Sequence, residues 1–405
     1  MATIYPFRPL RPNPFDAGRL IFTKSQTESV AGEEINGLKP LKTLLETGAR
    51  QRPETPESQA HAYAGILQNL GILVEQENLW QEPNPSIYIY ESSRKKYGQT
   101  GVWALTDLLD YGSGNIRIHE LTFGESVRRM KNYRQHTGLE GSPVLLTYPA
   151  QNDIEDIILQ IKAGKPDISY GNTHGRHRLW KVQELNVIQQ LVDAFLTVQD
   201  VYLADGHHRS ESALQLAVEQ TESGLPVFGK ISSLYMSLEE LRIQRYDRVI
   251  IPDEPINQEE LFRQLTENFH LLQSAGNIPV EPTTVHRFGM CLGKQWYHML
   301  AKAHTYEKAC SICSLDAAIL QDKVLAPVFG IEDPKTDKRL NCVGGEEAID
   351  EIALILQQEP QAIVFTLCPL SKEQLVAVAD AGEILPPKST WIEPKIPYGL
   401  LIQKH

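Results

Sequence analysis

Long apolar runs are missing from this sequence. No stretch approaches the roughly 20 apolar residues that a membrane-spanning helix needs. Residues 1–15 contain no apolar run of the length found in secretory signals. We therefore expect no membrane partner and a cytoplasmic location.

Several catalytic signatures are also missing. Gly164-Lys165 lacks the upstream glycine of a P-loop. The chain has neither the Gly-x-Gly-x-x-Gly of dinucleotide-binding folds nor the Gly-x-Ser-x-Gly of α/β-hydrolases. The fourth residue after His119 is Phe123 rather than histidine, which excludes the zinc-protease motif.

Cysteine is sparse, and its number is odd. The cysteines are Cys291, Cys310, Cys313, Cys342 and Cys368. An odd number without a regular framework predicts free thiols in a reducing compartment. Cys310 and Cys313 form a lone Cys-x-x-Cys, without a thioredoxin-like context or a second pair to complete a zinc site. We expect them to be two packed thiols.

Negative charge dominates the composition. The formal net charge is -12 at pH 7. A surface of that sign repels nucleic acid and anionic membranes, so we expect no nucleic-acid partner, although a local basic pocket for phosphate is compatible with it. The 405 residues are 41% hydrophobic and 22% charged, the usual globular mix, and their number predicts two or three domains.

Strand and helix patterns alternate along the chain, which is typical of an α/β protein, with a mixed (α+β) rather than purely parallel sheet. The predicted strands are 87–90, 100–109, 116–119, 143–148, 201–203, 242–250 and 286–292. The predicted helices are 58–70, 153–163, 185–195, 210–219, 315–325, 346–357 and 371–381, with another at 125–136. We expect an N-terminal α/β region at 1–85, a mixed-sheet domain at 86–235 and a C-terminal α/β domain at 236–405.

The segment Asp205-Gly206-His207-His208-Arg209 stands between a predicted strand and a predicted helix. Ligands of α/β sheets bind off the carboxyl ends of strands, and a helix N-terminus offers N–H groups to an anion. Gly206 permits a tight turn, and Arg209 can bind phosphate through two hydrogen bonds. Asp205 can hold a metal ion or accept a hydroxyl proton. Because the two histidines are adjacent, we expect at most one to face the substrate.

A structural role is the alternative for this segment, with Asp205 as a helix cap and His208 as a packed side chain. Capping does not explain five consecutive polar or glycine residues directly after an apolar strand. We therefore favour a functional site.

His119-Glu120-Leu121-Thr122 is a second candidate, because it also follows a predicted strand and precedes a helix. Glu120 could act as general base for a substrate hydroxyl. The alternative is a capping box formed by Thr122 and Glu125. The residues alone leave both interpretations open.

Half of the twelve histidines lie between positions 119 and 208: His119, His136, His174, His177, His207 and His208. A metal site is conceivable, but no pair has the helical i, i+4 spacing of zinc ligands. We expect several of them to be surface or core residues.

Near the end of the sequence, Pro386-Pro387 precedes Lys388, Ser389 and Thr390. A rigid bend that presents a lysine and two hydroxyls together is a reasonable phosphate clamp. A surface loop with a buried Trp391 is the equally weighted alternative.

Together these motifs resemble the DUF1015 family nearly from end to end. The matching segments are Phe7-Arg8-Pro9-Leu10-Arg11-Pro12, the His119 to Thr122 motif, Tyr202 to Arg209, Gly330 to Pro334, Thr336 to Arg339, Pro386 to Trp391 and Glu393-Pro394-Lys395.

The Asp-Gly-His-His-Arg segment is also similar to that of ParB/sulfiredoxin-fold kinases of free L-serine. This second resemblance implies a ParB/sulfiredoxin-like sheet at 86–235 and phosphoryl transfer from ATP or ADP with Mg²⁺. It implies Glu120 as base, with Asp205 and His208 at the substrate and the metal. Gly206, His207 and Arg209 would lie on the nucleotide phosphates, together with Lys388, Ser389 and Thr390.

The sequence departs from the DUF1015 pattern in three places. The acidic and lysine-rich run that usually ends in Asp-Arg reads Glu125-Ser126-Val127-Arg128-Arg129-Met130 here. The usual Pro-Tyr-Asp reads Ile21-Phe22-Thr23, and a usual aspartate is Asn341. If these positions bind substrate or metal, specificity is altered or activity is lost.

Three functions are therefore carried forward. The first is a small-molecule kinase that transfers a phosphoryl group between a nucleotide and a hydroxyl metabolite, with free serine as the leading substrate. The second is a phosphoserine phosphatase that uses the same site without a nucleotide. The third is a non-catalytic nucleotide-binding regulator. The sequence does not predict the oligomeric state.

Overall fold

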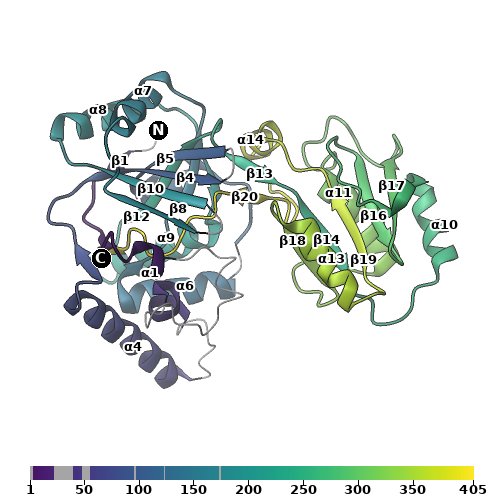
Figure 1. The fold of residues 1–405 in the computed structure, drawn as a ribbon, viewed down its shortest axis with the longest axis horizontal. Helices are drawn as coiled ribbons and strands as arrows, with labels where there is room; N and C mark the ends of the chain where they lie inside the picture. Colours follow the sequence, from purple (N-terminus) through teal and green to yellow (C-terminus); the bar gives the residue numbers. More distant parts are fainter. Residues whose placement is uncertain (1–2, 22–39, 48–54, 95–96, 123, 173–174) are drawn as a thin grey trace. The chain divides into compact units, whose positions relative to one another are not determined.

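The computed structural model describes residues 3–21, 40–47, 55–94, 97–122, 124–172 and 175–405. Phe22, Thr23, Phe123 and His174 lie outside the described residues. The chain divides into two compact units, of which unit 1 comprises Met1–Leu241 and Pro394–His405 and unit 2 comprises Arg242–Glu393 (Figure 1). The chain passes from unit 1 to unit 2 after Leu241, near the predicted domain boundary at 235. The segment 1–85 belongs to unit 1, and the C-terminal residues return to it.

Among the residues that the structure describes, a mixed sheet of nine strands forms the centre of unit 1. Its strand order is β6-β11-β8-β12-β5-β4-β10-β9, and β1 pairs with β5. β11 runs parallel to β6, and β12 parallel to β8, while the other pairs are antiparallel. The mixed α/β prediction is therefore confirmed. The strands are β1 Ile4–Tyr5, β4 Ile87–Arg94, β5 Tyr97–Asp107, β6 Ile116–Arg117, β8 Val144–Tyr148, β9 Ile168–Asn172, β10 Gly175–Val182, β11 Val201–Asp205 and β12 Lys230–Ser237.

Helices lie on both sides of this sheet, with α7 and α8 on one side and α6 and α9 on the other (Figure 1). The amphipathic pattern of α7 and α8 buries Ile154, Ile158, Leu191 and Phe195 against the strands. The helices of unit 1 are α1 Ala17–Leu20, η1 Thr43–Thr47, α4 Pro56–Glu75, α5 Leu108–Gly112, α6 Gly124–Thr137, α7 Asn152–Lys162, α8 Leu185–Leu196 and α9 His207–Glu222. Two short strand pairs join β2 Leu10–Pro12 to β3 Leu79–Gln81 and β7 Leu139–Glu140 to β21 Gln403–Lys404.

Unit 2 has its own antiparallel sheet of six strands, in the order β15-β17-β16-β19-β14-β18. Apolar side chains from both sheet faces form separate core clusters with the helices. Its strands are β13 Arg242–Gln244, β14 Tyr246–Ile250, β15 Phe269–Gln273, β16 Arg287–Leu292, β17 Gln295–Ala301, β18 Leu340–Gly344, β19 Ile363–Leu367 and β20 Trp391–Glu393. Its helices are α10 Gln258–Asn268, η2 Ala275–Asn277, α11 Asp316–Leu320, η3 Gln321–Leu325, α12 Ala326–Phe329, α13 Ala348–Gln358 and α14 Lys372–Asp380.

None of the described helices combines the length and the apolar character that a bilayer crossing requires.

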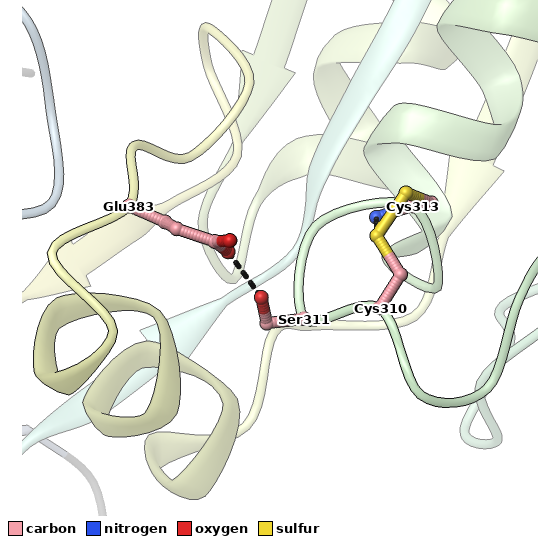
Figure 2. The surroundings of a disulfide bond; sticks show 4 residues. All are labelled: Cys310, Ser311, Cys313 and Glu383. Carbon is pink, nitrogen blue, oxygen red and sulfur yellow. Dashed lines mark hydrogen bonds between the residues drawn. A yellow bond between two sulfur atoms is a disulfide. The ribbon is translucent and has the colours of Figure 1, made fainter.

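The prediction of two free thiols at Cys310 and Cys313 is wrong, because these residues form a disulfide in unit 2 (Figure 2). A turn brings their Cα atoms to 5.3 Å, within the range that a disulfide can bridge. Between them, the Ser311 hydroxyl donates to the Glu383 carboxylate (Figure 2). The spacing was compatible with this bond, but only the turn shows that the two side chains meet.

Candidate active site

The two polar motifs of the sequence meet because their strands are neighbours. β6 and β11 run side by side in parallel, with Ile116 opposite Val201. Since parallel strands present their carboxyl ends at the same sheet edge, Glu120 and Asp205 emerge together there. A register shift between Leu203 and Asp205 interrupts the pairing of β11 with β8. Such bulges re-aim side chains and are frequent beside active sites.

Helix α9 begins directly after this edge. Its N-cap residue is Gly206, which provides no side-chain cap. The alternative in which Asp205 caps the helix is therefore wrong. Gly206 has φ 105°, a left-handed conformation that glycine adopts with least strain. Because no side chain of the N-cap residue occupies the first N–H groups of α9, they are suited to bind an anion.

Replacing Gly206 by alanine is expected to lower both stability and ligand binding. A Cβ atom at this position would lie 2.9 Å from Cγ1 of Val144 and 3.0 Å from Nη2 of Arg209. Because these close contacts add to the strain of a positive φ, we expect the free energy of unfolding to fall by roughly 1–3 kcal/mol. Urea denaturation measures this loss. The matched control is Gly224→Ala after the other end of α9, where φ is 65° but no atom lies within 4 Å. Equal losses in the two variants would contradict the close packing at Gly206.

Two buried histidines lie beside Glu120 and Asp205. The rings of His119 and His207 meet edge to face at 4.5 Å, and the residues are 0% and 4% exposed. Burial lowers the pKa of His119 to about 4, although Asp205 raises it, and burial also lowers the pKa of His207 well below its ordinary value. Both rings are therefore neutral at physiological pH.

These two imidazoles have unused hydrogen-bonding capacity. The described residues provide no hydrogen-bond partner for either ring nitrogen of His119 or for Nε2 of His207. Buried polar atoms are nearly always paired, so such unpaired nitrogens are expected where a ligand or an ordered water completes the site. The Oε2 atom of Glu120 lies 3.8 Å from Nδ1 of His207, and the Glu120 side chain is 37% exposed. Glu120 is thus open to a substrate, while His208 is half-buried in the first turn of α9.

Asp205 stands between two cations. Its Oδ2 atom accepts a hydrogen bond from Nη2 of Arg209 at 2.8 Å, and Nζ of Lys395 lies 3.8 Å from Oδ1. Nη1 of Arg209 donates to the Pro143 carbonyl at 2.5 Å. A guanidinium has five N–H donors, so these contacts are compatible with the predicted phosphate contact of Arg209. Lys395 was not among the predicted site residues, although it belongs to the Glu-Pro-Lys segment that resembles the family.

The predicted metal role of Asp205 depends on a ligand. Within the described part of the chain, no group of three or more His, Cys, Asp or Glu side chains could hold a metal ion. Mg²⁺ is nevertheless commonly bound by one or two carboxylates together with substrate phosphates and water. Asp205, which is partly exposed, fits that arrangement but not a preformed metal centre.

Asp205 and Arg209 also line a cavity of about 350 Å³ in unit 1. Residues from α6, from the turn before β8 and from the C-terminal segment complete it, among them Arg129, Tyr133 and Tyr398. Tyr133 and Tyr398 were not predicted, because they come from segments far apart in the chain, whereas Arg129 lies in the segment that departs from the family pattern.

Lys388, Ser389 and Thr390 belong to unit 2. Arg248 fixes their loop by donating to the carbonyls of Pro387 at 3.3 Å and Lys388 at 3.0 Å. The Ser389 hydroxyl donates to the Pro386 carbonyl at 2.6 Å. Trp391 is half-buried rather than fully buried. The contact of these residues with nucleotide phosphates stays a prediction.

One protein-family model matches residues 4–318, and its description is "Protein of unknown function (DUF1015)". No curated protein matches the chain.

Several solved structures resemble the chain at low identity. SbnI with a C-terminal truncation, from Staphylococcus aureus, is 13% identical, with 74% of this chain and 87% of that chain covered and a TM-score of 0.41. A free serine kinase in complex with AMP is 11% identical, with 74% and 92% covered and a TM-score of 0.38. A conserved hypothetical protein from Pyrococcus furiosus is 12% identical, with 74% and 95% covered and a TM-score of 0.36.

Proposed function

Since the chain belongs to the DUF1015 family, we propose that unit 1 transfers a phosphoryl group between a nucleotide and the hydroxyl of a small metabolite, with free serine as the first substrate to test. The observation that carries this proposal is the convergence of Glu120, Asp205 and the N-terminus of α9 at one sheet edge, beside two buried histidines whose ring nitrogens include some that no described residue pairs.

The arrangement supplies what phosphoryl transfer needs, which is mostly positioning and neutralisation of charge. The first N–H groups of α9 and the Arg209 guanidinium would bind phosphate oxygens. Glu120 would accept the proton of the attacking hydroxyl. The hydroxyl oxygen then bonds to the terminal phosphorus, and the bond from that phosphorus to the bridging oxygen breaks, so that the shortened nucleotide leaves.

Asp205 would hold Mg²⁺ together with the nucleotide phosphates. When bound, Mg²⁺ neutralises phosphate charge and polarises the transferred group. His119 and His207, being neutral, would form hydrogen bonds with the substrate without adding charge to the site.

Phosphorus NMR tests this function directly. The full chain with Mg²⁺ is incubated with ATP or ADP and with serine or homoserine, and separately with phosphoserine alone. We expect a phosphoserine or phosphohomoserine signal to grow as the nucleotide loses its terminal phosphate. The Asp205→Asn variant is the control, because it removes one carboxylate charge at the same size.

Each other outcome overturns the kinase assignment. Phosphate release from phosphoserine without nucleotide would assign the site to a phosphatase. Nucleotide binding that raises the melting temperature, with no product in any pairing, would assign it to a regulator. The absence of both binding and turnover would contradict the site itself.

A further inference from the structure

The cavity beside Asp205 is separate from the Glu120–histidine side of the site. Asp205 at the end of β11 lines it together with Arg209 and Ser212 of α9. Glu120, His119 and His207 are not among its lining residues. The cavity therefore adds a compartment that shares Asp205 and Arg209 with the candidate site but is not lined by the proposed base.

The charge of this compartment is opposite to that of the whole chain. Three carboxylates and five cationic side chains line it. The cations are Lys42, Arg129, Arg134, Arg209 and Lys395. An excess of two positive charges inside a chain of net charge -12 attracts an anion to this place.

Arg134 is a buried cation among the residues that line the cavity. It is 4% exposed, its Nη2 atom donates to the carbonyls of Phe228 and Lys230 at 3.0 Å and 2.7 Å, and it forms an ion pair with Glu140. Its Nε atom is buried and has no hydrogen-bond partner among the described residues. A buried unpaired donor is costly unless a ligand or an ordered water accepts from it, and Arg134 is one of the residues that line the cavity.

The remaining lining of the cavity is largely apolar. Met130, Leu139, Leu145 and Ile231 line it together with aromatic side chains. These aromatic residues are Tyr133 and Tyr398, whose hydroxyl oxygens lie 3.1 Å apart. Sites of roughly 300–1,000 Å³ with such walls hold ligands of drug size. Free serine would fill only a small part of this volume.

We propose that this cavity binds an organic anion with an apolar body, which, if the proposed function holds, is the larger of the two reactants. Its anionic group lies against the cations near Asp205, and its apolar body lies between α6 and the C-terminal segment. Two sources share this chemistry. One is the nucleotide donor, with its base as the apolar body, and the other is a hydroxy acid acceptor with an apolar side chain.

The test measures binding rather than turnover, so it does not depend on the phosphoryl transfer. Isothermal titration calorimetry on the full chain compares the binding of ADP with that of pyrophosphate, which lacks the base. It also compares the binding of 3-phenyllactate with that of lactate, which lacks the phenyl ring. The Arg129→Glu variant removes the excess positive charge at an exposed position, and we expect at least about tenfold weaker binding of the ligand. Arg128→Glu is the matched control, because it makes the same change at the adjacent exposed residue, which does not line the cavity.

If ADP binds and pyrophosphate does not, the ligand of the cavity is the nucleotide donor. If 3-phenyllactate binds and lactate does not, the ligand is the hydroxy acid acceptor. Either result, with a loss in Arg129→Glu and none in Arg128→Glu, supports the proposal even if no phosphoryl transfer occurs. Equal affinities in the two variants place the ligand elsewhere and overturn the proposal while the proposed function stands. Binding of none of the four probes also overturns it.

Discussion

Replacing Glu120 by glutamine is expected to lower the turnover of phosphoryl transfer by ~10²–10⁴-fold, the usual contribution of a general base. Glutamine keeps the size of the side chain but cannot take the hydroxyl proton. Because the Glu120 side chain is 37% exposed and lies at a sheet edge, we expect the fold to survive. The measurement is kcat and KM by phosphorus NMR or a coupled assay, with the loss expected in kcat.

Glu125→Gln is the matched control for this variant. Glu125 is an exposed carboxylate in the first turn of α6. Glutamine also satisfies a capping box, so a capping role for Glu125 would survive the change. We expect activity close to that of the wild type. Full activity in Glu120→Gln would remove Glu120 from the mechanism.

Replacing Arg134 by methionine is expected to lower the free energy of unfolding of unit 1 by about 3–5 kcal/mol, the usual cost of leaving a buried charge without its partner. The Arg134–Glu140 pair has side chains that are 5% and 10% exposed. Glu140 also accepts hydrogen bonds from the Ser232 N–H and the His405 ring, both at 2.9 Å. Methionine fills the space but leaves the carboxylate buried with weaker compensation.

The matched control for Arg134→Met is Arg117→Met. Arg117 pairs with Asp200 at 2.7 Å, but the two side chains are 37% and 39% exposed. An exposed pair of this kind contributes at most about 1 kcal/mol. Urea denaturation, followed separately for the transition of each unit, compares the variants. Similar losses in both would contradict the importance of burial at Arg134.

The pH dependence of this effect has a definite sign. Burial by itself raises the pKa of Glu140, but Arg134 and His405 oppose it and hold the pKa below its ordinary value of 4.5. The stabilisation is therefore present above that value and is lost as pH falls through the lower pKa of the folded state. In Arg134→Met, burial acts without Arg134 and raises the pKa of Glu140. The stability gap between wild type and variant should narrow as pH is lowered from 7 towards 4.

The strand–helix junction of the candidate site could be predicted from the sequence, whereas most of the residues around it could not. An apolar strand followed by polar residues located the junction at Asp205, where β11 does end and α9 begins two residues later. Local patterns carry this information because strand and helix periodicity depend on near neighbours. The meeting of Glu120 with Asp205 depends on β6 lying beside β11, which neither segment encodes alone. Only the family resemblance joined them beforehand.

Features formed by distant segments were beyond local patterns. Lys395 and Tyr398 reach the cavity because the chain returns to unit 1 after the whole of unit 2. No composition shift marks that return. The disulfide at Cys310 and Cys313 depends on a turn whose geometry the spacing does not determine. Features that depend on near neighbours in the sequence could therefore be predicted, whereas features that depend on tertiary contacts could not.

The return of the C-terminal segment also sets an order of events during synthesis. The tyrosines that meet in the cavity wall, Tyr133 and Tyr398, are 265 residues apart in the chain. Ribosomes add roughly 5–20 residues per second, so the first tyrosine waits on the order of tens of seconds for the second. Throughout that time the nascent chain lacks Lys395 and the partner of β7. The lining of the cavity is complete only once Tyr398 has left the ribosome.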